Sequence, residues 1–290
     1  MFSGVNYSFN TKYILNMEVD KMTNREKDIF QRLSDHYKEA LEYFPEDQIV
    51  GVFLQGSQNY GLDIEGSDVD TKLIVLPTLD DICFNRKAVS TTHVRENDEH
   101  IDFKDIRLMF QTFRKQNLNF VEILFTEYKI INPMYVDLWQ KLVDNNELIA
   151  HYNPYAAVKT MKGIAMEKYH AMEHEYPSKL DILAKWGYDP KQLHHLFRVE
   201  EYLLRYIRGE EYAKCLISEQ PDFLKLIKQG SYTLGDARWM GKACLDRVTE
   251  VADKFCEEHP ASQDPRVDEL LDEVQAAIVK KSIKKSLLEE

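Results

Sequence analysis

Apolar residues near the beginning of the chain recur at the spacing of one face of a helix. Thr23 opens the sequence T-N-R-E, a match to the capping box in which Glu26 stands at the third helical position. The apolar residues that follow lie three or four positions apart, at Ile29, Leu33, Tyr37 and Leu41. This pattern predicts an amphipathic helix over residues 23–44.

The next apolar residues form short runs that are typical of strands. One run covers residues 49–54, a second covers 69–76 and stops at Pro77, and a shorter one at 99–103 predicts a third strand. Because these apolar runs are short and bounded by polar or turn residues, they predict the strands of a small sheet.

Helical spacing returns after the third run and continues to the end of the chain. Residues 106–113 and 120–126 are predicted to be helical, and no convincing strand follows residue 133. Several of the later helices begin near a proline, which suits a first turn; they are 133–149, 154–175, 190–208, 221–228, 234–257 and 267–288. We therefore predict an α+β fold, with a sheet-bearing domain at 1–130 and an all-helical C-terminal domain at 131–290.

The composition predicts a soluble protein of the cytoplasm. Of 290 residues, 44% are hydrophobic and 30% are charged, which excludes a disordered or fibrous chain. No apolar run approaches the roughly 20 residues that cross a bilayer, and residues 1–20 lack a signal-peptide core. The four cysteines contain no CxxC pair, which argues against disulfides or a cysteine zinc site. We expect no membrane partner.

The net charge of −12 limits the partners further. A protein that coats long nucleic acid by electrostatics normally carries a basic face, which this composition does not favour. An enzyme that holds a nucleotide through metal ions can be acidic, because carboxylates are the metal ligands. The charge therefore leaves a metal-dependent nucleotide enzyme open.

The most informative stretch joins a Gly-Ser pair to a pair of aspartates. Side chains alternate along a strand, so Asp68, Asp70 and Lys72 are expected to point the same way. Neighbouring carboxylates repel each other unless a cation lies between them, and Mg²⁺ commonly takes one or two carboxylates plus substrate phosphates. Upstream, Gly56 and Ser57 end a strand before a turn, where free backbone N–H groups can hold phosphate. Either feature alone fits a polar turn, whereas both together indicate nucleotide chemistry.

This stretch, G-S-Q-N-Y-G-L followed by S-D-V-D-T-K-L-I-V, resembles the signature of nucleotidyltransferases of the DNA polymerase beta superfamily. It is most similar to the bacterial and phage members whose genes often accompany RNA-repair systems. The resemblance covers residues 49–240 and implies a nucleotidyltransferase-type mixed sheet with a helical domain that closes the nucleotide cleft. It also implies a third catalytic carboxylate, for which Asp102 is favoured within its apolar-flanked strand. The alternatives for that position are Asp98, Glu99 and Asp105, the last of which is placed to cap a helix.

The resemblance extends into the helical half. Residues 187–198 are similar to the family's G-Y-x-x-K-x-x-x-H-L-x-R helix, in which Lys191, His195 and Arg198 share one face. The resemblance implies that these basic side chains contact a triphosphate or an RNA end. A solvated or ion-paired stripe is the structural alternative.

Other matching positions have less specific roles. Within the matching segment 117–125, Glu122 is either a metal ligand or a structural partner, and the loop at 227–234 is interpreted as structural. Further nucleotide-binding positions implied by the resemblance are Gly56, Ser57, Ser67 and Lys72.

The implied reaction transfers a nucleoside monophosphate from an NTP to a hydroxyl acceptor and releases pyrophosphate. In it, Asp68 and Asp70 hold two Mg²⁺ or Mn²⁺ ions, one of them shared with Asp102, which accepts the proton of the acceptor. An RNA 3′ end or a tRNA is the favoured acceptor. Thr71 and Lys72 replace the Tyr-Arg pair that is common after the aspartates, which leaves the substrate open.

Two alternatives belong to other functional classes. The sequence H-A-M-E-H at residues 170–174 matches the zinc motif of inverzincin peptidases, with His170 and His174 as ligands and Glu173 as general base. A polar helix with two histidines explains the same pattern. The second alternative is a nucleotide-binding sensor or antitoxin-like partner without catalysis, against which the three aspartates argue.

Overall fold

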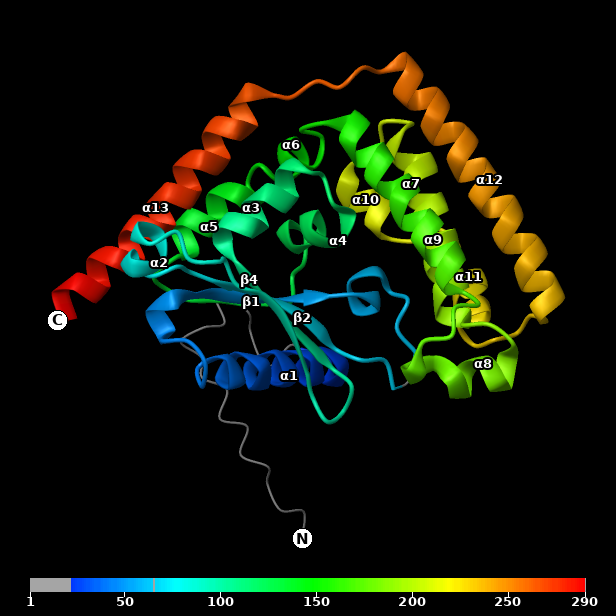
Figure 1. Ribbon diagram of the computed structural model, residues 1–290, viewed down its shortest axis with the longest axis horizontal. Helices are drawn as coiled ribbons and strands as arrows, with labels where there is room; N and C mark the ends of the chain where they lie inside the picture. Colours follow the sequence, from blue (N-terminus) through cyan, green and yellow to red (C-terminus); the bar gives the residue numbers. More distant parts are fainter. Residues whose placement is uncertain (1–21, 65, 290) are drawn as a thin grey trace, which may run out of the picture.

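The computed structural model describes residues 22–64 and 66–289, and the predicted α+β fold is confirmed (Figure 1). The sheet is mixed, with strand order β3-β4-β2-β1-β5. Strands β2 and β4 are parallel, whereas the other neighbouring pairs are antiparallel. The strand bounds are β1 Ile49–Gln55, β2 Asp70–Val75, β3 Ser90–Val94, β4 His100–Asp105 and β5 Lys129–Ile131.

Helices make up most of the rest of the described chain. The α-helices are α1 Asn24–Ala40, α2 Leu79–Cys83, α3 Ile106–Arg114, α4 Leu118–Val121, α5 Val136–Val143, α6 Asn146–Ala150, α7 Pro154–Ala171, α8 Leu180–Trp186, α9 Pro190–Tyr206, α10 Tyr212–Leu216, α11 Pro221–Lys228, α12 Leu234–Glu258 and α13 Pro265–Glu289. The short 3-10 helices are η2 Glu46–Gln48, η3 Ser57–Tyr60, η4 Glu122–Leu124 and η5 Pro177–Lys179.

Helix α1 covers one face of the sheet (Figure 1). Its capping box is confirmed, because the Thr23 side chain accepts from the Glu26 amide and the Glu26 side chain accepts from the Thr23 amide. The predicted apolar face buries Ile29, Leu33 and Tyr37 against the strands. The helix ends at Ala40, whereas the sequence pattern predicted residue 44. Beyond Ala40 the amides of Glu42 and Tyr43 bond to carbonyl oxygens three residues back, so the chain continues as tighter turns.

The opposite face of the sheet carries the larger core. One cluster of buried apolar side chains runs from β1 through α5, α7 and α9 to α12 and α13. Phe53 of β1 packs against Trp139 of α5 with ring centroids 4.5 Å apart. Such burial of large aromatic area is a major stabilising term. The division into domains at residues 1–130 and 131–290 stays a prediction.

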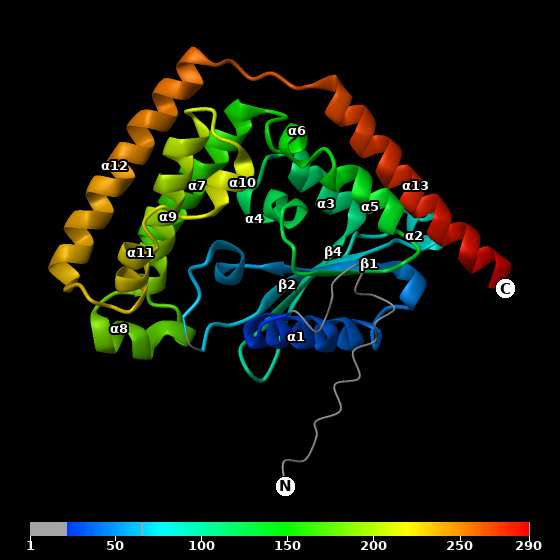
Figure 2. The ribbon, with the colours of Figure 1, turned by 180° about the vertical axis from the view of Figure 1, so that it is seen from behind.

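Helices α12 and α13 lie along the outside of this half and are inclined toward each other (Figure 2). Helix α12 packs on α7 and α9, and α13 packs on α3 and α5. On α3, Arg114 binds Asp268 and Asp272 of α13 at 2.9 and 2.7 Å. Within residues 22–64 and 66–289, none of the helices has the length and apolar character needed to cross a membrane.

The elements that sequence patterns missed are short or lack an apolar pattern. Strand β3 reads S-T-T-H-V with mostly exposed side chains, and it is a strand only because β4 pairs with it. Strand β5 has three residues, which is too few for periodicity to reveal. The helix predicted at 133–149 is instead α5 and α6, and α2, α8 and α10 were not predicted.

Replacing Gly51 by alanine is expected to destabilise the fold. A Cβ at this position lies 2.7 Å from the Ile130 carbonyl oxygen of the neighbouring strand, and backbone cannot move aside as a side chain can. We expect a loss of about 1–3 kcal/mol in the free energy of unfolding, measured by urea denaturation. The matched control is Gly163→Ala in α7, where the Cβ meets nothing within 4 Å. This change should stabilise the protein by about 0.5–1 kcal/mol; equal effects at the two glycines contradict the prediction.

Candidate active site

The Gly-Ser pair lies at the end of β1, where the chain turns sharply. Gly56 has φ 104° and Gly61 has φ 68°, both in the region that favours glycine, and the 3-10 helix η3 lies between them. The first amides of such a helix have no partner inside it, which makes this turn suitable for binding an anion. The turn sits beside the aspartates because Gln55 is paired with Asp70 across the two strands.

The loop after η3 is held to the turn by specific hydrogen bonds. Gln58 Nε2 donates to the Asp68 carbonyl oxygen at 2.5 Å, and the Ile64 amide donates to Ser67 Oγ at 2.9 Å. These bonds place the backbone just before the carboxylate pair. Ser67 therefore shapes the loop in this structure.

Asp68 and Asp70 open into a cavity of about 340 Å³. Their side chains are 37% and 32% exposed, so neither carboxylate is sealed in the core. The residues that line the cavity are mostly polar; they are Gln55, Gly56, Ser57, Ile64, Gly66, Ser67, Asp68, Asp70, Lys191, His194, His195 and Lys228. The turn, the acidic pair and the basic helix predicted from sequence are thus brought together in one place.

The helical wall of the cavity carries positive charge. Lys191 Nζ lies 3.5 Å from Asp68 Oδ2, and Lys191 stands at the start of α9, where Asp189 caps the helix. Burial lowers the pKa of His195 well below its usual value and that of His194 to about 4, so both rings are neutral at pH 7. The positive charge on this wall therefore comes from lysine.

Sequence reasoning missed His194 on this wall, and it also missed Lys228. Lys228 ends α11, and its ammonium donates to the Leu62 carbonyl and to Ser67 Oγ, both at 3.3 Å. Burial lowers its pKa, and the neighbouring Lys191 lowers it further. The loop at 227–234, interpreted from sequence as structural, was the available signal, and it contributes Lys228 to the cavity.

Arg198 lies away from the cavity, although its spacing from Lys191 predicts that both lie on one face of α9. Its guanidinium packs in the core over the Tyr60 ring, 3.4 Å from the centroid. Its charge acts on the carboxyl group of Glu122, which is 2% exposed. Burial raises the pKa of Glu122 to about 8. In this structure Glu122 and Arg198 are buried neighbours behind the turn.

Asp102 is paired with a lysine in this structure. Lys72 Nζ lies 3.1 Å from Asp102 Oδ2, and the lysine side chain is only 3% exposed. Burial lowers the pKa of Lys72, an effect that the Asp102 carboxylate opposes. The ammonium also lies over the Phe120 ring, 3.8 Å from its centroid. Asp102 does not line the cavity that holds Asp68 and Asp70.

The alternatives to Asp102 have other partners or positions. Asp105 caps α3 and pairs with Arg107 at 2.6 Å, as its place before a helix suggested. Glu99 is buried; although burial disfavours its charge, hydrogen bonds from His36 and Asn97 hold its pKa at about 2. Asp98 lies in the turn between β3 and β4, with φ 63°.

The predicted zinc motif does not form on one helix. Helix α7 ends at Ala171, so His170 lies on the helix and His174 beyond it. Glu173 is ion-paired with Arg238 of α12 at 2.6 Å. Among the residues that the structure describes, no group of three or more His, Cys, Asp and Glu side chains is placed to hold a metal ion.

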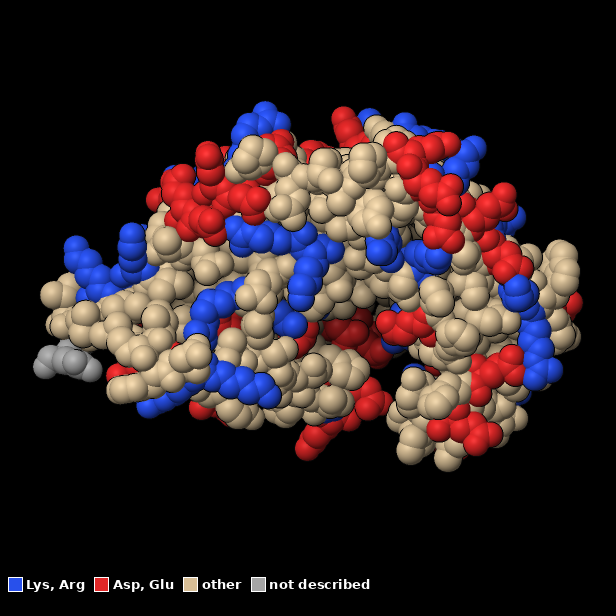
Figure 3. Space-filling model, turned by 45° about the horizontal axis from the view of Figure 1, so that its top comes forward, with Lys and Arg blue, Asp and Glu red and all other residues tan. Residues whose placement is uncertain are grey.

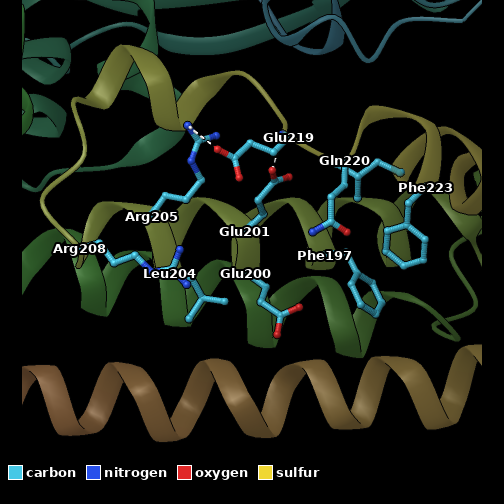
Figure 4. A pocket seen from close by; sticks show the side chains of 10 residues that line it. Phe197, Glu200, Glu201, Leu204, Arg205, Arg208, Glu219, Gln220 and Phe223 are labelled. Atoms are coloured by element: carbon cyan, nitrogen blue, oxygen red, sulfur yellow. Dashed lines mark hydrogen bonds and ion pairs between the residues drawn. The ribbon is translucent and has the colours of Figure 1, made fainter.

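A second hollow, between α9 and the segment leading into α11, has different chemistry (Figure 4). Several of its charged groups already have partners: Arg205 pairs with Glu219 at 3.6 Å, and Glu201 accepts from Ser218 at 2.7 Å. Figure 3 shows acidic and basic side chains intermingled over one face of the molecule. Asp or Glu side chains lie deep in a hollow near the centre of that view. The cavity at Asp68 differs because two carboxylates there face two lysines beside a glycine turn.

Comparison with known proteins does not assign the chain to a family. No family of known proteins and no curated protein matches it. A similar solved structure is that of a nucleotidyltransferase-like protein from Exiguobacterium sibiricum. The match covers 89% of this chain and 92% of that one, with 14% identity and a TM-score of 0.30. The function must therefore be argued from the geometry of the site itself.

The buried carboxyl group of Glu122 predicts a specific pH dependence of stability. Its pKa is raised from 4.5 to about 8 in the folded state, so the folded chain retains a proton that the unfolded chain loses. Relative to Glu122→Gln, the wild type should lose stability as the pH rises from about 4.5 to about 8. Urea denaturation across this range measures the difference, with Glu167→Gln as the exposed control. A difference that does not change with pH contradicts the raised pKa.

Proposed function

We propose that this protein is a metal-dependent nucleotidyltransferase that transfers a nucleoside monophosphate from an NTP to a hydroxyl acceptor. The observation that carries the proposal is one cavity in which Asp68 and Asp70 face Lys191 and Lys228 beside a glycine turn. A carboxylate pair binds a divalent cation, and lysines together with free amides bind phosphate oxygens. Few ligands other than a metal-bound polyphosphate satisfy both walls.

The phosphate-binding groups come from two parts of the chain. The Gly56-Ser57 turn offers backbone amides and a hydroxyl group from the sheet side, and Lys191 and Lys228 approach from the helices. Lys191 Nζ lies 3.5 Å from Asp68 Oδ2. We propose that it turns to the triphosphate when a cation takes its place at that carboxylate.

The donor set at the cavity fits one divalent cation. Asp68 and Asp70 supply carboxylate oxygens at the partly exposed rim, which is the set that Mg²⁺ or Mn²⁺ takes together with substrate phosphates. Such an ion would stabilise the negative charge that develops on the transferred phosphate, and it would lower the pKa of the acceptor hydroxyl. The chain's own part is to position the triphosphate in line with that hydroxyl and to neutralise the leaving pyrophosphate with lysine.

The remaining implied roles stay predictions. Asp102 as a catalytic metal ligand, and Ser67, Lys72, His195 and Arg198 as nucleotide contacts, come from the resemblance alone. An RNA 3′ end or a tRNA is the acceptor we propose. A cytoplasmic location is also proposed, and the four free cysteines are compatible with a reducing compartment.

Replacing either cavity aspartate should strongly reduce transfer. Asp68→Asn and Asp70→Asn remove a negative ligand without changing side-chain size, so we expect activity to fall by about a hundredfold or more. The assay incubates each NTP, labelled at the α-phosphate, with Mg²⁺ and total cellular RNA, and follows label in RNA. Asp80→Asn, an exposed aspartate on α2, is the matched control and should keep full activity.

The outcomes of this assay separate the classes of function. Label in RNA that is lost with Asp68→Asn supports the proposal, and label in a protein fraction instead changes the acceptor. Transfer that persists in the double Asp68→Asn/Asp70→Asn variant contradicts the assignment of the site. NTP binding without any transfer favours the nucleotide-binding sensor.

Lys228→Ala should weaken the binding of the nucleotide more than the chemical step. A lost hydrogen bond between a cation and a phosphate costs about 1.5–3 kcal/mol, so the KM for NTP should rise about tenfold or more. Steady-state kinetics measure KM and kcat separately. Lys242→Ala, an exposed lysine of α12 paired with Asp246, is the control. An unchanged KM for the Lys228 variant excludes the residue from the phosphate site.

A further inference from the structure

We infer that the ammonium of Lys72 occupies the place of a second divalent ion, so that the site holds a single ion at Asp68 and Asp70. This inference rests on the proposed function and deepens it. The resemblance implies two ions held by Asp68 and Asp70, one of them shared with Asp102. The structure instead pairs Asp102 with Lys72.

The sheet register sets Lys72 against Asp102. In the parallel pairing of β2 with β4, Lys72 lies opposite Asp102 and Thr71 lies opposite Ile101. Residues opposite one another in a sheet point to the same face, so the ammonium and the carboxylate meet on the face that also bears Asp70. The 3.1 Å distance between Lys72 Nζ and Asp102 Oδ2 follows from this register rather than from a flexible surface contact.

The group beside Asp70 on the next strand is a histidine, not a carboxylate. Asp70 Oδ1 accepts from the His100 amide at 3.0 Å and from His100 Nδ1 at 2.9 Å. Asp102 lies two residues further along β4, which at the rise of a strand is about 6–7 Å away. One ion bridging Asp70 and Asp102 would therefore have to span this offset, while Asp102 Oδ2 is already bound by the Lys72 ammonium.

Neighbouring side chains enclose the Lys72 ammonium and fix its position. The side chain is 3% exposed, and the ammonium lies between Asp102 and the face of the Phe120 ring. Asp70 is the other carboxylate whose charge acts on it. Displacing the ammonium would leave a buried charge without a partner, which is strongly unfavourable. The fixed ammonium of Lys72 thus neutralises Asp102, the carboxylate that a second divalent ion would need as a ligand.

Lys72 is accordingly a positioning residue that acts through Asp102 and Asp70. It has the same sign of charge as the ion that it replaces, but it cannot be removed by chelation or exchanged between Mg²⁺ and Mn²⁺. The carboxylates that remain available to an exchangeable ion are Asp68 and Asp70, which line the cavity.

Counting bound Mn²⁺ tests the inference without relying on activity. The full-length chain is titrated with Mn²⁺ in the presence of an ATP analogue that has a methylene group between the α- and β-phosphates. Electron paramagnetic resonance reports both the number of bound ions and whether two of them are close, because ions about 3.5–4 Å apart couple magnetically. Titration of the analogue alone gives the background.

The variants separate the roles of the two partners. The wild type and Asp102→Asn should each bind one uncoupled ion with the same affinity, and Asp70→Asn should bind it at least about tenfold more weakly. Lys72→Met removes the charge at similar volume and should admit a second, coupled ion. Lys72→Arg keeps the charge and should again bind one ion. Circular dichroism verifies that each variant is folded, and the Asp102→Asn measurement stands even where Lys72→Met is not.

Three results overturn the inference. These are a coupled pair of ions in the wild type, a loss of the ion in Asp102→Asn, and a folded Lys72→Met variant that still binds one ion. A wild type that binds no ion overturns both this inference and the proposed metal dependence. A wild type that binds one ion but transfers no nucleotide overturns the proposed function alone.

Discussion

The antiparallel pairing of β1 with β2 is the constraint on which the candidate site depends. Its register places Gln55 opposite Asp70, so the glycine turn that ends one strand lies beside the acidic start of the other. A shift of the register by one residue would turn every side chain of β2 to the other face of the sheet. It would turn Asp70 and Lys72 toward α1, into the apolar cluster that contains Leu73. Burying these charged side chains among apolar ones is unfavourable, and this keeps Asp70 on the side of the cavity.

The helical half completes the site because of how α9 and α11 pack. Leu193 and Leu196 are fully buried, which orients α9 so that Lys191 and His195 line the cavity. Helix α11 lies against α9 and ends at Lys228, whose ammonium binds the loop that leads to the aspartates. The apolar core thus positions the lysines, and the lysines in turn tie the two halves of the chain together at the cavity.

Carboxylates of the same type have very different environments in this sheet. Glu99 is held ionised by hydrogen bonds, and Glu122 is buried so that it favours its neutral form. Asp102 has a lysine partner. Asp68 and Asp70 differ from these because they stand at a partly exposed rim with lysine on the opposite wall. Which acid can take a cation is therefore decided by the groups around it, not by residue type.

The sequence by itself determined the features that depend on neighbouring residues. The Thr23 capping box, the apolar strands, the turn glycines and the helix cap at Asp105 were all predicted, since caps, periodicity and turns are local properties. The strand pattern placed Asp70 and Lys72 on one face of β2, whereas Asp68 lies before the strand begins, so strand alternation does not explain its position.

Only the tertiary structure decided which distant residues meet. It made β3 and β5 strands by pairing them, placed Lys228 at the cavity and turned Arg198 into the core. It also paired Lys72 with Asp102, thirty positions apart, through the parallel register of β2 and β4. These contacts arise from the packing of elements far apart in the chain, which no local spacing records.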